Sequence, residues 1–464
     1  MARFPRETVV VGFDQSRIAR REVLAAGAAL GGLLPVKATA AAHDHDSAKQ
    51  QKRRERSVIV LLQEGGMSHF ESWDPKPAAP SEVRGSFETI QTSNPELHIG
   101  EHMPLLAQQA HVFNVIRSVY MDNARRDHSP GLHWVLTGYD NQSAGVSLEK
   151  HNRYPAVGSV VAHQRNGATA IGLPCFVTIP NSRQLGNRVR YTGAMHLGAN
   201  HEPFDSGSVP DRSDVQYTTP AGLSLPSDVS GRRLQNRRVL LESTGLLQRT
   251  HRESTRHTGL AGFQATAFDL LMGDRGKRAF DLNLESAKTR AAYGNSQMGQ
   301  GTLLARRLVE HGVSYVLVNY SKNNSWDTHG DNFNKLKNTL LPPMDRAASA
   351  LLADLDERGM LDDVLVVLMG EMGRTPKINK KSGRDHWPDV FSVMIAGGGL
   401  TRGHVLGSST RLGETPAERP VHYHEILATI YHQLGIDPHL MINDGQGRPI
   451  RIMPEADVIR ELCV

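Results

Sequence analysis

The sequence predicts an α/β fold, in which a mostly parallel β-sheet is sandwiched by helices. From residue 313 onward, apolar strand-like runs alternate with segments whose apolar residues recur at helical spacing. Several of these elements end at glycine, as at Gly397-Gly398-Gly399 and Gly435. Such alternation is typical of parallel strands covered by helices on both faces. Ligands bind beyond the carboxyl ends of these strands, so the residues that follow each run are the first site candidates.

Three of the apolar runs are each followed by a cluster of candidate metal ligands. The runs span residues 58–62, 313–320 and 364–369. Their polar clusters span residues 63–69, 326–331 and 370–375, and Arg384-Asp385-His386 comes shortly after the last. Because parallel strands end at the same edge of a sheet, we expect the clusters to converge on one site.

Further elements are predicted along the rest of the chain. Helices are expected near residues 103–110, 332–358 and 424–434, and strands at 112–119 and 391–396. Residues 153–200 are expected to alternate short strands and turns. Residues 201–235 are rich in Ser, Pro, Gly and Asp and indicate a surface loop, and the pattern from 236 to 307 is helical.

The N-terminus has the features of an export signal. Arg20-Arg21 precedes a short apolar segment at 25–34, and small-residue cleavage candidates follow at 38–42. We therefore predict a twin-arginine signal at 1–42, a polar linker at 43–56 and one domain at 57–464 that contains a loop and helical insertion at 201–300. This signal implies a periplasmic or secreted protein. A disordered or helical arm is the alternative for the first segment.

The composition excludes several classes of protein. The formal net charge of +5 owes much to the basic N-terminal segment, and no zinc finger, RNA-binding motif or basic-aromatic stripe is present, so no nucleic-acid partner is expected. No apolar stretch approaches the roughly 20 residues that span a bilayer. Cys175 and Cys463 form neither a disulfide framework nor a metal-type spacing, and a single bridge between them is left open.

Asp327 and His329 are the first candidates for metal ligands. A carboxylate oxygen and an imidazole nitrogen two residues apart, directly after a strand, suit Zn²⁺, Mn²⁺ or iron. The alternative is structural, with Asp327 or Thr328 capping the helix that begins near Asn332 and His329 at the surface.

Glu371 and the pair Asp385-His386 are the next candidates. A buried carboxylate after a strand is costly unless it is paired or metal-bound. Arg374 could hold an anionic substrate, or it could form a structural ion pair with Glu371. Asp385 and His386 could supply two metal ligands, or a base with its orienting carboxylate, although their loop also suits a solvated turn.

Ser68, His422 and His128 are weaker candidates. Ser68 is a candidate nucleophile, but no G-x-S-x-G elbow surrounds it. His422 precedes the last helix and could point at the site or remain a loop histidine. Taken alone, the segment around His128 is a turn followed by a short helix.

Several motifs, in this order along the chain, resemble the DUF1501 family of exported bacterial proteins, which is often described as sulfatase-like. The resemblance covers nearly all of the chain after the leader. It rests on the segments Gly65-Gly66-Met67-Ser68-His69, Trp73-Asp74-Pro75-Lys76-Pro77, Trp326-Asp327-Thr328-His329, Gly370-Glu371-Met372-Gly373-Arg374-Thr375-Pro376, Gly383-Arg384-Asp385-His386, Gly397-Gly398-Gly399 and residues 303–310 and 428–436.

That family looks like a branch of the alkaline phosphatase/sulfatase superfamily. The resemblance implies hydrolysis of phosphate or sulfate esters with one or two divalent cations and a Ser, Thr or modified Cys nucleophile. It places Glu64 at the position of the first metal-binding carboxylate, and Asp327 and His329 at that of a mid-chain ligand pair. Glu371 stands where many members have an Asp, with Met372 at the position of a His ligand that Asp385-His386 could replace.

The same resemblance places His128 in the nucleophile position, where a histidine could be a metal ligand or a phospho-accepting nucleophile. Our hypothesis is an exported hydrolase of sulfate or phosphate esters, on a small molecule or a polysaccharide. It would depend on a divalent metal (Zn, Ca, Mg or Mn), with Arg374 stabilising anionic charge. The alternatives are a non-catalytic anion- or glycan-binding protein that retains the fold, and a structural protein of the envelope.

Overall fold

The computed structural model describes residues 55–121, 126–139, 154–182, 192–218, 228–243, 270–320 and 324–464, together with residues 220, 223, 225 and 268. Residues 54–464 form one compact unit, and the expected export signal lies outside the described residues. A nine-stranded sheet runs through this unit in the order β12-β4-β11-β8-β1-β7-β5-β6, with β15 also paired to β4. These strands are β1 Ser57–Leu62, β4 Phe113–Tyr120, β5 Phe176–Ile179, β6 Phe204–Asp205, β7 Tyr315–Asn319, β8 Val364–Met369, β11 Phe391–Gly397, β12 Val405–Leu406 and β15 Val421–His422.

The sheet is mostly parallel, as predicted. β1 pairs in parallel with β7 on one side, where Val58 faces Tyr315, and with β8 on the other. β11 runs antiparallel to both β8 and β4, while the other pairings in the sheet are parallel. Every residue of β1 and β8 is buried. These strands are continuous apolar runs because helices cover both faces of the sheet.

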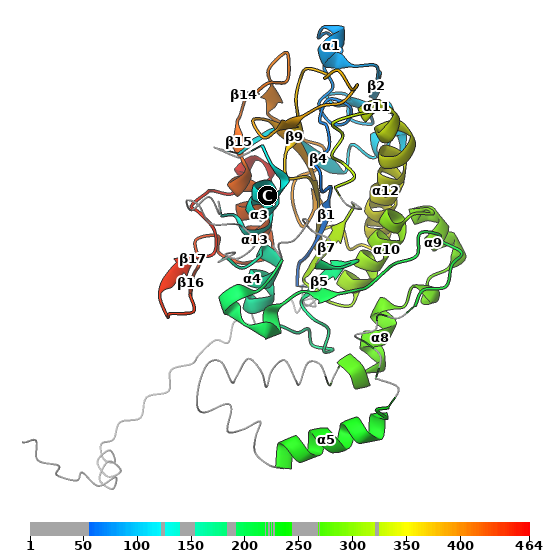
Figure 1. Ribbon diagram of the computed structural model, residues 1–464, viewed down its shortest axis with the longest axis vertical. Coiled ribbons are helices and arrows are strands. Elements are labelled where there is room, and N and C mark those ends of the chain that lie inside the picture. The colour runs from blue at the N-terminus through cyan, green and yellow to red at the C-terminus, as the bar shows by residue number, and fades with distance from the viewer. Residues whose placement is uncertain are drawn as a thin grey trace, which may run out of the picture. The chain divides into compact units, whose positions relative to one another are not determined.

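Alternate residues of the central strands pack into two cores, one on each face of the sheet. On β1, Ile59 and Leu61 join one core, while Val58, Val60 and Leu62 join the other. Figure 1 shows α3 (His128–Thr137), α4 (Val157–Gln164) and α13 (Tyr423–Gln433) on one side of the central strands. On the other side are α10 (Gln297–Glu310) and α12 (Leu341–Glu357), which pack against each other.

The predicted long helix at 332–358 is present as a continuous run with a π-helical middle. It consists of α11 (Asn332–Lys335), a π-helical segment at Leu336–Leu340 and α12. Pro342 and Pro343 open α12, where a missing N–H costs nothing to the first turn. They cannot donate the i→i−4 bonds of a continuous α-helix, which accounts for the change of helical pitch just before them.

Two sequence-based expectations differ from the structure. Residues 157–164 form α4 and not short strands, although β5 and β6 do follow. Val157, Val160 and Val161 are β-branched, but they fall at helical spacing and are all buried against the sheet. Tertiary packing thus overrides their local preference for strands. The expected helix near 103–110 is shortened to α2 at Pro104–Ala107.

In the described part of the insertion at 201–300, residues 206–218 form neither helix nor strand, and the later residues are largely helical. The remaining described elements are α1 Ser81–Arg84, α5 Gly231–Ser243, α8 Asp274–Phe280, α9 Ala287–Tyr293, the hairpins β2 Thr89–Gln91 with β3 His98–Gly100, β9 Gly373–Arg374 with β10 His386–Trp387, β13 Ser408–Ser409 with β14 Pro416–Glu418 and β16 Met441–Asn443 with β17 Pro449–Arg451, and the 3₁₀ turns Met195–Leu197, Ala199–His201, Leu282–Leu284 and Arg460–Leu462. Among the described helices, none has the length and apolar character needed to cross a membrane.

Candidate metal centre

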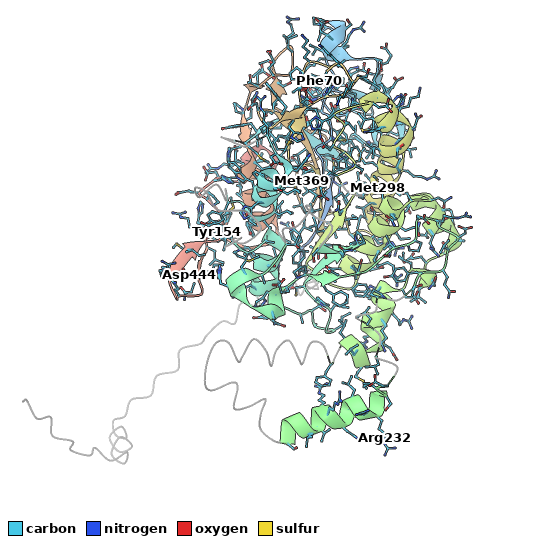
Figure 2. All side chains as sticks on the ribbon, viewed as in Figure 1. Phe70, Tyr154, Arg232, Met298, Met369 and Asp444 are labelled. Carbon is cyan, nitrogen blue, oxygen red and sulfur yellow. The ribbon has the colours of Figure 1, made fainter. Side chains whose placement is uncertain are left out.

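The segments that follow β1, β7 and β8 meet at one edge of the sheet. These strands are neighbours and run in the same direction, and Met369, the last residue of β8, lies in the middle of the molecule (Figure 2). The Gly65 N–H donates to Glu371 Oε1 at 2.8 Å, which joins the segment after β1 to the segment after β8. Arg374, after β8, pairs with Asp327, after β7, at 2.7 Å. The predicted convergence of the three strand ends is therefore confirmed.

Ligand atoms from three distant segments gather around the carboxylate of Asp327. His128, Asp327 and His386 each offer one ligand atom within 4.8 Å of the others. His128 Nε2 lies 3.1 Å from Asp327 Oδ2, and His386 Nε2 lies 3.2 Å from Oδ1. His329 Nε2 is 3.2 Å from the same Oδ1 and 3.0 Å from His386 Nε2. One carboxylate thus faces the Nε2 atoms of three imidazoles.

The opposite nitrogen of each ring is held by an oxygen that can only accept a hydrogen bond. His128 Nδ1 lies 2.6 Å from Glu371 Oε1, and His329 Nδ1 lies 2.6 Å from Asp385 Oδ1. His386 Nδ1 lies 2.8 Å from the carbonyl oxygen of Arg126. Since carboxylates and carbonyls accept, each Nδ1 is a hydrogen-bond donor, and each Nε2 is left facing Asp327.

This arrangement fits a bound divalent metal. Three imidazole lone pairs and a carboxylate that point at one another repel unless a cation or a proton lies between them. Ligand atoms around a tetrahedral metal at 2.0–2.1 Å are separated by roughly 3.3 Å. The separations of 3.0 and 3.2 Å among His329, His386 and Asp327 are close to that value. Outer partners on the Nδ1 atoms are also typical of metal-binding histidines.

The electrostatics show how strongly the centre attracts positive charge. Burial alone would lower the pKa of His128, but its hydrogen bonds to Asp327 and Glu371 raise it to about 9. Burial alone would raise the pKa of Asp327, but His128, His386 and Arg374 hold it far below the ordinary value of an aspartate. Asp327 therefore stays ionised, and it favours a cation at the imidazole nitrogens.

Arg374 lies beneath the centre, where it fixes the Asp327 carboxylate. Its side chain is fully buried, and its NH2 group donates to Asp327 Oδ1 at 2.7 Å. The guanidinium also donates to four backbone carbonyls, those of Gly65, Gly66, Trp326 and Arg384. The expected ion pair with Glu371 is replaced by this set of contacts. The guanidinium faces the protein interior, not a substrate.

Glu371 and Asp385 were expected to be metal ligands, but in the structure their carboxylates contact the histidine rings. The Glu371 side chain is fully buried, and it accepts hydrogen bonds from His128 and from the Gly65 N–H. The Asp385 side chain is 54% exposed and accepts from His329 and from Asn379 Nδ2. Both carboxylates thus orient histidine rings around Asp327.

Glu64, Ser68 and His422 lie elsewhere in the described structure. Glu64 is buried, and its Oε2 accepts a hydrogen bond from Asn319 Nδ2 at 3.0 Å. Ser68 Oγ is buried and has no hydrogen-bond partner among the described residues. His422 is the N-cap of α13, where its Nδ1 accepts from the His424 N–H at 3.3 Å. None of the three belongs to the group whose ligand atoms meet.

The sequence offered little signal for the role of Arg126 and its neighbours. The main-chain carbonyl of Arg126 orients His386. The guanidinium of Arg126 lies 4.2 Å from the centroid of the Trp387 ring. It also pairs with Asp389 at 3.0 Å. A main-chain carbonyl leaves no mark on residue type, so only the fold could reveal this contact.

Cys175 and Cys463 are both free.

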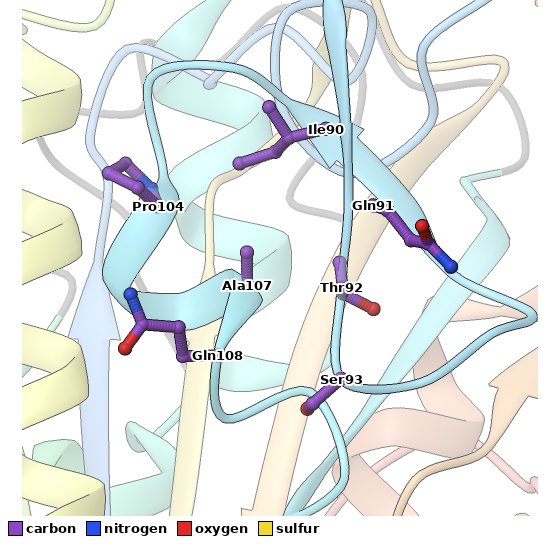
Figure 3. Close-up of a pocket in the computed structure, with 7 residues that line it drawn as sticks. All are labelled: Ile90, Gln91, Thr92, Ser93, Pro104, Ala107 and Gln108. Carbon is purple, nitrogen blue, oxygen red and sulfur yellow. The ribbon is translucent and has the colours of Figure 1, made fainter.

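Two cavities of similar size differ in their relation to the centre. One groove, of about 510 Å³, is lined by Asp327 together with Asn324, Ser325, Lys335, Thr339 and Leu340. The other, of about 460 Å³, lies between α2 and the loop after β2 (Figure 3). Its lining is Ile90, Gln91, Thr92, Ser93, Pro104, Ala107 and Gln108, which contains no titratable side chain. Of these two cavities, only the first is lined by a residue of the candidate metal centre, Asp327.

The family description "Protein of unknown function (DUF1501)" matches residues 55–463. The chain belongs to the DUF1501 family. Comparison with curated proteins gives no match.

Solved structures that share features with the chain include three hydrolases. A sulfatase from Pseudoalteromonas sp. is 12% identical, with 83% of this chain and 69% of that chain covered and a TM-score of 0.37. A phosphonate monoester hydrolase from Silicibacter pomeroyi is 11% identical, with coverages of 85% and 75% and a TM-score of 0.33. TAB5 alkaline phosphatase is 12% identical, with coverages of 83% and 99% and a TM-score of 0.35. All three TM-scores are below 0.5, so family membership rests on the sequence match alone.

Proposed function

We propose that this DUF1501 protein is an exported, metal-dependent hydrolase of sulfate or phosphate esters. The observation that carries the proposal is the convergence of three histidine Nε2 atoms on Asp327 while each Nδ1 is held by an acceptor oxygen. The arrangement is the one that metal-binding histidines need.

Each residue of the centre has a distinct part in this proposal. His128, His386 and Asp327, whose ligand atoms lie within 4.8 Å of one another, would hold the metal, and His329 Nε2, 3.2 Å from Asp327 Oδ1, would border it. Two nitrogen ligands and one oxygen favour Zn²⁺ or another transition metal over Ca²⁺ and Mg²⁺, which prefer oxygen. A divalent metal bound there would polarise the ester oxygen and lower the pKa of a bound water.

The outer residues of the centre would keep its geometry. Glu371 and Asp385 would accept hydrogen bonds from Nδ1 of His128 and His329, so that the Nε2 atom of each ring is held toward the metal. Arg374 would hold the Asp327 carboxylate in place. Arg374 would thus be a positioning residue, and its buried guanidinium would not contact the substrate.

Water is the proposed nucleophile. Ser68 Oγ is buried and has no hydrogen bond to the centre in the described part of the chain. The position that the family resemblance assigned to a nucleophile is held by His128, whose Nε2 faces Asp327. In the proposed reaction, water attacks phosphorus or sulfur, the bond to the alcohol oxygen breaks, and the alcohol leaves with a proton.

Metal analysis and an ester screen test this proposal. Elemental analysis of the purified mature protein should find about one transition metal per chain, and Asp327→Asn should remove most of it. Aryl sulfates and aryl phosphates should then be hydrolysed by the metal-loaded protein and not by Asp327→Asn. A mature protein that binds no divalent metal would sink the proposal.

A non-catalytic anion- or glycan-binding protein is the second candidate. It is favoured by His128, an imidazole, which stands where the family resemblance places the nucleophile, and by Ser68 Oγ, which has no hydrogen bond to the centre among the described residues. In that case the protein would bind the metal but hydrolyse none of the esters in the screen, whatever their leaving group.

The proposal includes export from the cytoplasm, and it is the N-terminal segment that supports this part. The twin-arginine pair at Arg20 and Arg21 precedes the apolar segment and cleavage candidates at 38–42. Replacing both arginines with lysine should leave the protein, with its leader uncleaved, in the cytoplasmic fraction.

A further inference from the structure

A groove of about 510 Å³ is lined in part by Asp327 and otherwise by residues that do not hold the proposed metal. Besides Asp327, its lining consists of Asn324, Ser325, Lys335, Thr339 and Leu340. These residues come from two elements, the loop after β7 and the helical run that begins at Asn332. Apart from Leu340, the lining offers amide, hydroxyl, carboxylate and ammonium groups.

The π-helical segment shapes one wall of this groove. The N–H of Leu341 donates to the carbonyl of Leu336, five residues earlier, which is the π-helical pattern. Lys335 and Thr339 both line the groove, whereas Leu336 is buried in the core. A π-helical turn inside an α-helix is uncommon and is frequent at functional sites. The wall that carries Lys335 and Thr339 is therefore a local feature of this stretch of helix.

One exposed lysine lines this groove, and two more lie on a loop that contacts the start of the same helix. Lys335, Lys380 and Lys381 are exposed, and within the described ranges none of them forms an ion pair. The Lys335 N–H donates to the Asp331 carbonyl at 3.1 Å, and the Asp331 N–H donates to the Lys381 carbonyl at 3.0 Å. The start of the helix and the lysine loop are therefore in direct contact.

The lysine loop also touches the centre. Asn379 Nδ2 donates to the His329 carbonyl at 3.0 Å and to Asp385 Oδ1 at 3.1 Å. The His329 side chain is 44% exposed, so the metal centre opens to solvent on this side. Asp327, Asp331 and Asp385 are the acidic residues here. A divalent cation in the centre, together with Lys335, Lys380 and Lys381, would outweigh their negative charge.

We propose that this groove and its lysine rim bind the chain of a polyanionic polysaccharide, with Lys335 and Lys381 contacting anionic groups next to the ester in the centre. The inference rests on the proposed function and names its substrate class. Unpaired exposed lysines bind anions without competition from a protein carboxylate. The Thr339 hydroxyl and the Asn324 amide supply hydrogen bonds suited to sugar hydroxyls. The lining contains no aromatic side chain on which nucleic-acid bases could stack, which argues against a single-stranded nucleic acid.

Binding of sulfated dextran oligosaccharides to the folded mature protein tests the inference without any need for catalysis. The variant Lys335→Ala/Lys381→Ala should bind them about fivefold to tenfold more weakly at low salt, and the difference should shrink as salt is raised. The matched control is Lys337→Ala, which removes an exposed lysine two residues from Lys335 and outside the groove. It should bind as the wild type does. Neutral dextran should bind to none of these proteins.

The outcomes separate this inference from the proposed function. Equal weakening by Lys337→Ala, or no binding of sulfated dextran to the wild type, would overturn the groove as a polyanion site. Tighter binding of oligothymidylate than of sulfated dextran would overturn the polysaccharide assignment. If the wild type binds sulfated dextran through Lys335 and Lys381 but cleaves no aryl ester, the inference stands and the hydrolase proposal fails.

Discussion

Glu371→Gln is the substitution that most directly tests how the metal centre is built. Glu371 Oε1 accepts from both His128 Nδ1 at 2.6 Å and the Gly65 N–H at 2.8 Å. A glutamine carbonyl can occupy the same place and accept both hydrogen bonds. The substitution therefore keeps the shape of the site and removes the negative charge that strengthens His128 as a ligand.

The expected loss follows from the burial of this carboxylate. Removing the outer partner of a metal-binding histidine typically costs 10–100-fold in metal affinity, which is about 1.4–2.7 kcal/mol. The Glu371 side chain is fully buried, whereas that of Asp385 is 54% exposed and screened by water. We expect Glu371→Gln to lie near the upper end of this range and Asp385→Asn near the lower end. Competition between metal-stripped protein and a chromophoric chelator for Zn²⁺ measures both.

A matched control is available on the rim of the same centre. Asp389 is 40% exposed and pairs with Arg126. Asp389→Asn removes a nearby charge without touching a histidine ring, and it should change Zn²⁺ affinity less than about twofold. Wild-type Zn²⁺ affinity in Glu371→Gln, or an equal loss in Asp389→Asn, would refute the orienting role of Glu371.

Three further predictions concern stability and the boundary of the site. Burial raises the pKa of Asp345 to about 6, despite the N–H groups of Leu105 and Leu106 that its carboxylate accepts. The proton is held more tightly in the native state than in the unfolded chain. The resulting stability is complete below about pH 4 and lost as the pH rises through 6, by up to about 3 kcal/mol. Urea unfolding at pH 4 and pH 7 should show this loss in the wild type and not in Asp345→Asn. Glu71→Gln should lower the free energy of unfolding by about 3–5 kcal/mol, because it leaves the buried Arg384 guanidinium without its carboxylate at 2.6 Å; a urea titration that shows less than about 1 kcal/mol contradicts this. His422→Ala should cost about 1 kcal/mol through loss of the α13 cap and leave Zn²⁺ affinity unchanged, and a tenfold loss of affinity would make His422 a ligand after all.

The sequence predicted most residues of the candidate centre, but not which of them would bind the metal and which would orient the histidine rings. Asp327 and His386 were predicted as ligands because they follow apolar strands, and the structure brings their ligand atoms together. Glu371 and Asp385 were placed among the ligands for the same reason. The structure puts both on Nδ1 atoms instead. Side-chain direction decides between a ligand and its partner, and it depends on contacts between residues 56 and 243 positions apart in the sequence.

His128 shows the limit of local sequence patterns. It precedes a short helix, and only the family resemblance marked it as a site residue. The structure places its Nε2 beside Asp327 because α3 begins at the same edge of the sheet as the segment after β7. Nothing in the sequence around His128 encodes that distance. Likewise, the carbonyl of Arg126 orients His386 through a main-chain atom that every residue type has.

By itself, the sequence determined the fold class, the family and the edge of the sheet at which chemistry would occur. Hydrophobic periodicity and strand ends are local properties, and burial of apolar surface drives them directly. The tertiary structure alone decided which donor atoms meet, which carboxylates orient them and which lysines border the groove beside them. Those facts depend on distances of a few ångströms between remote segments, which only the packed core brings into contact.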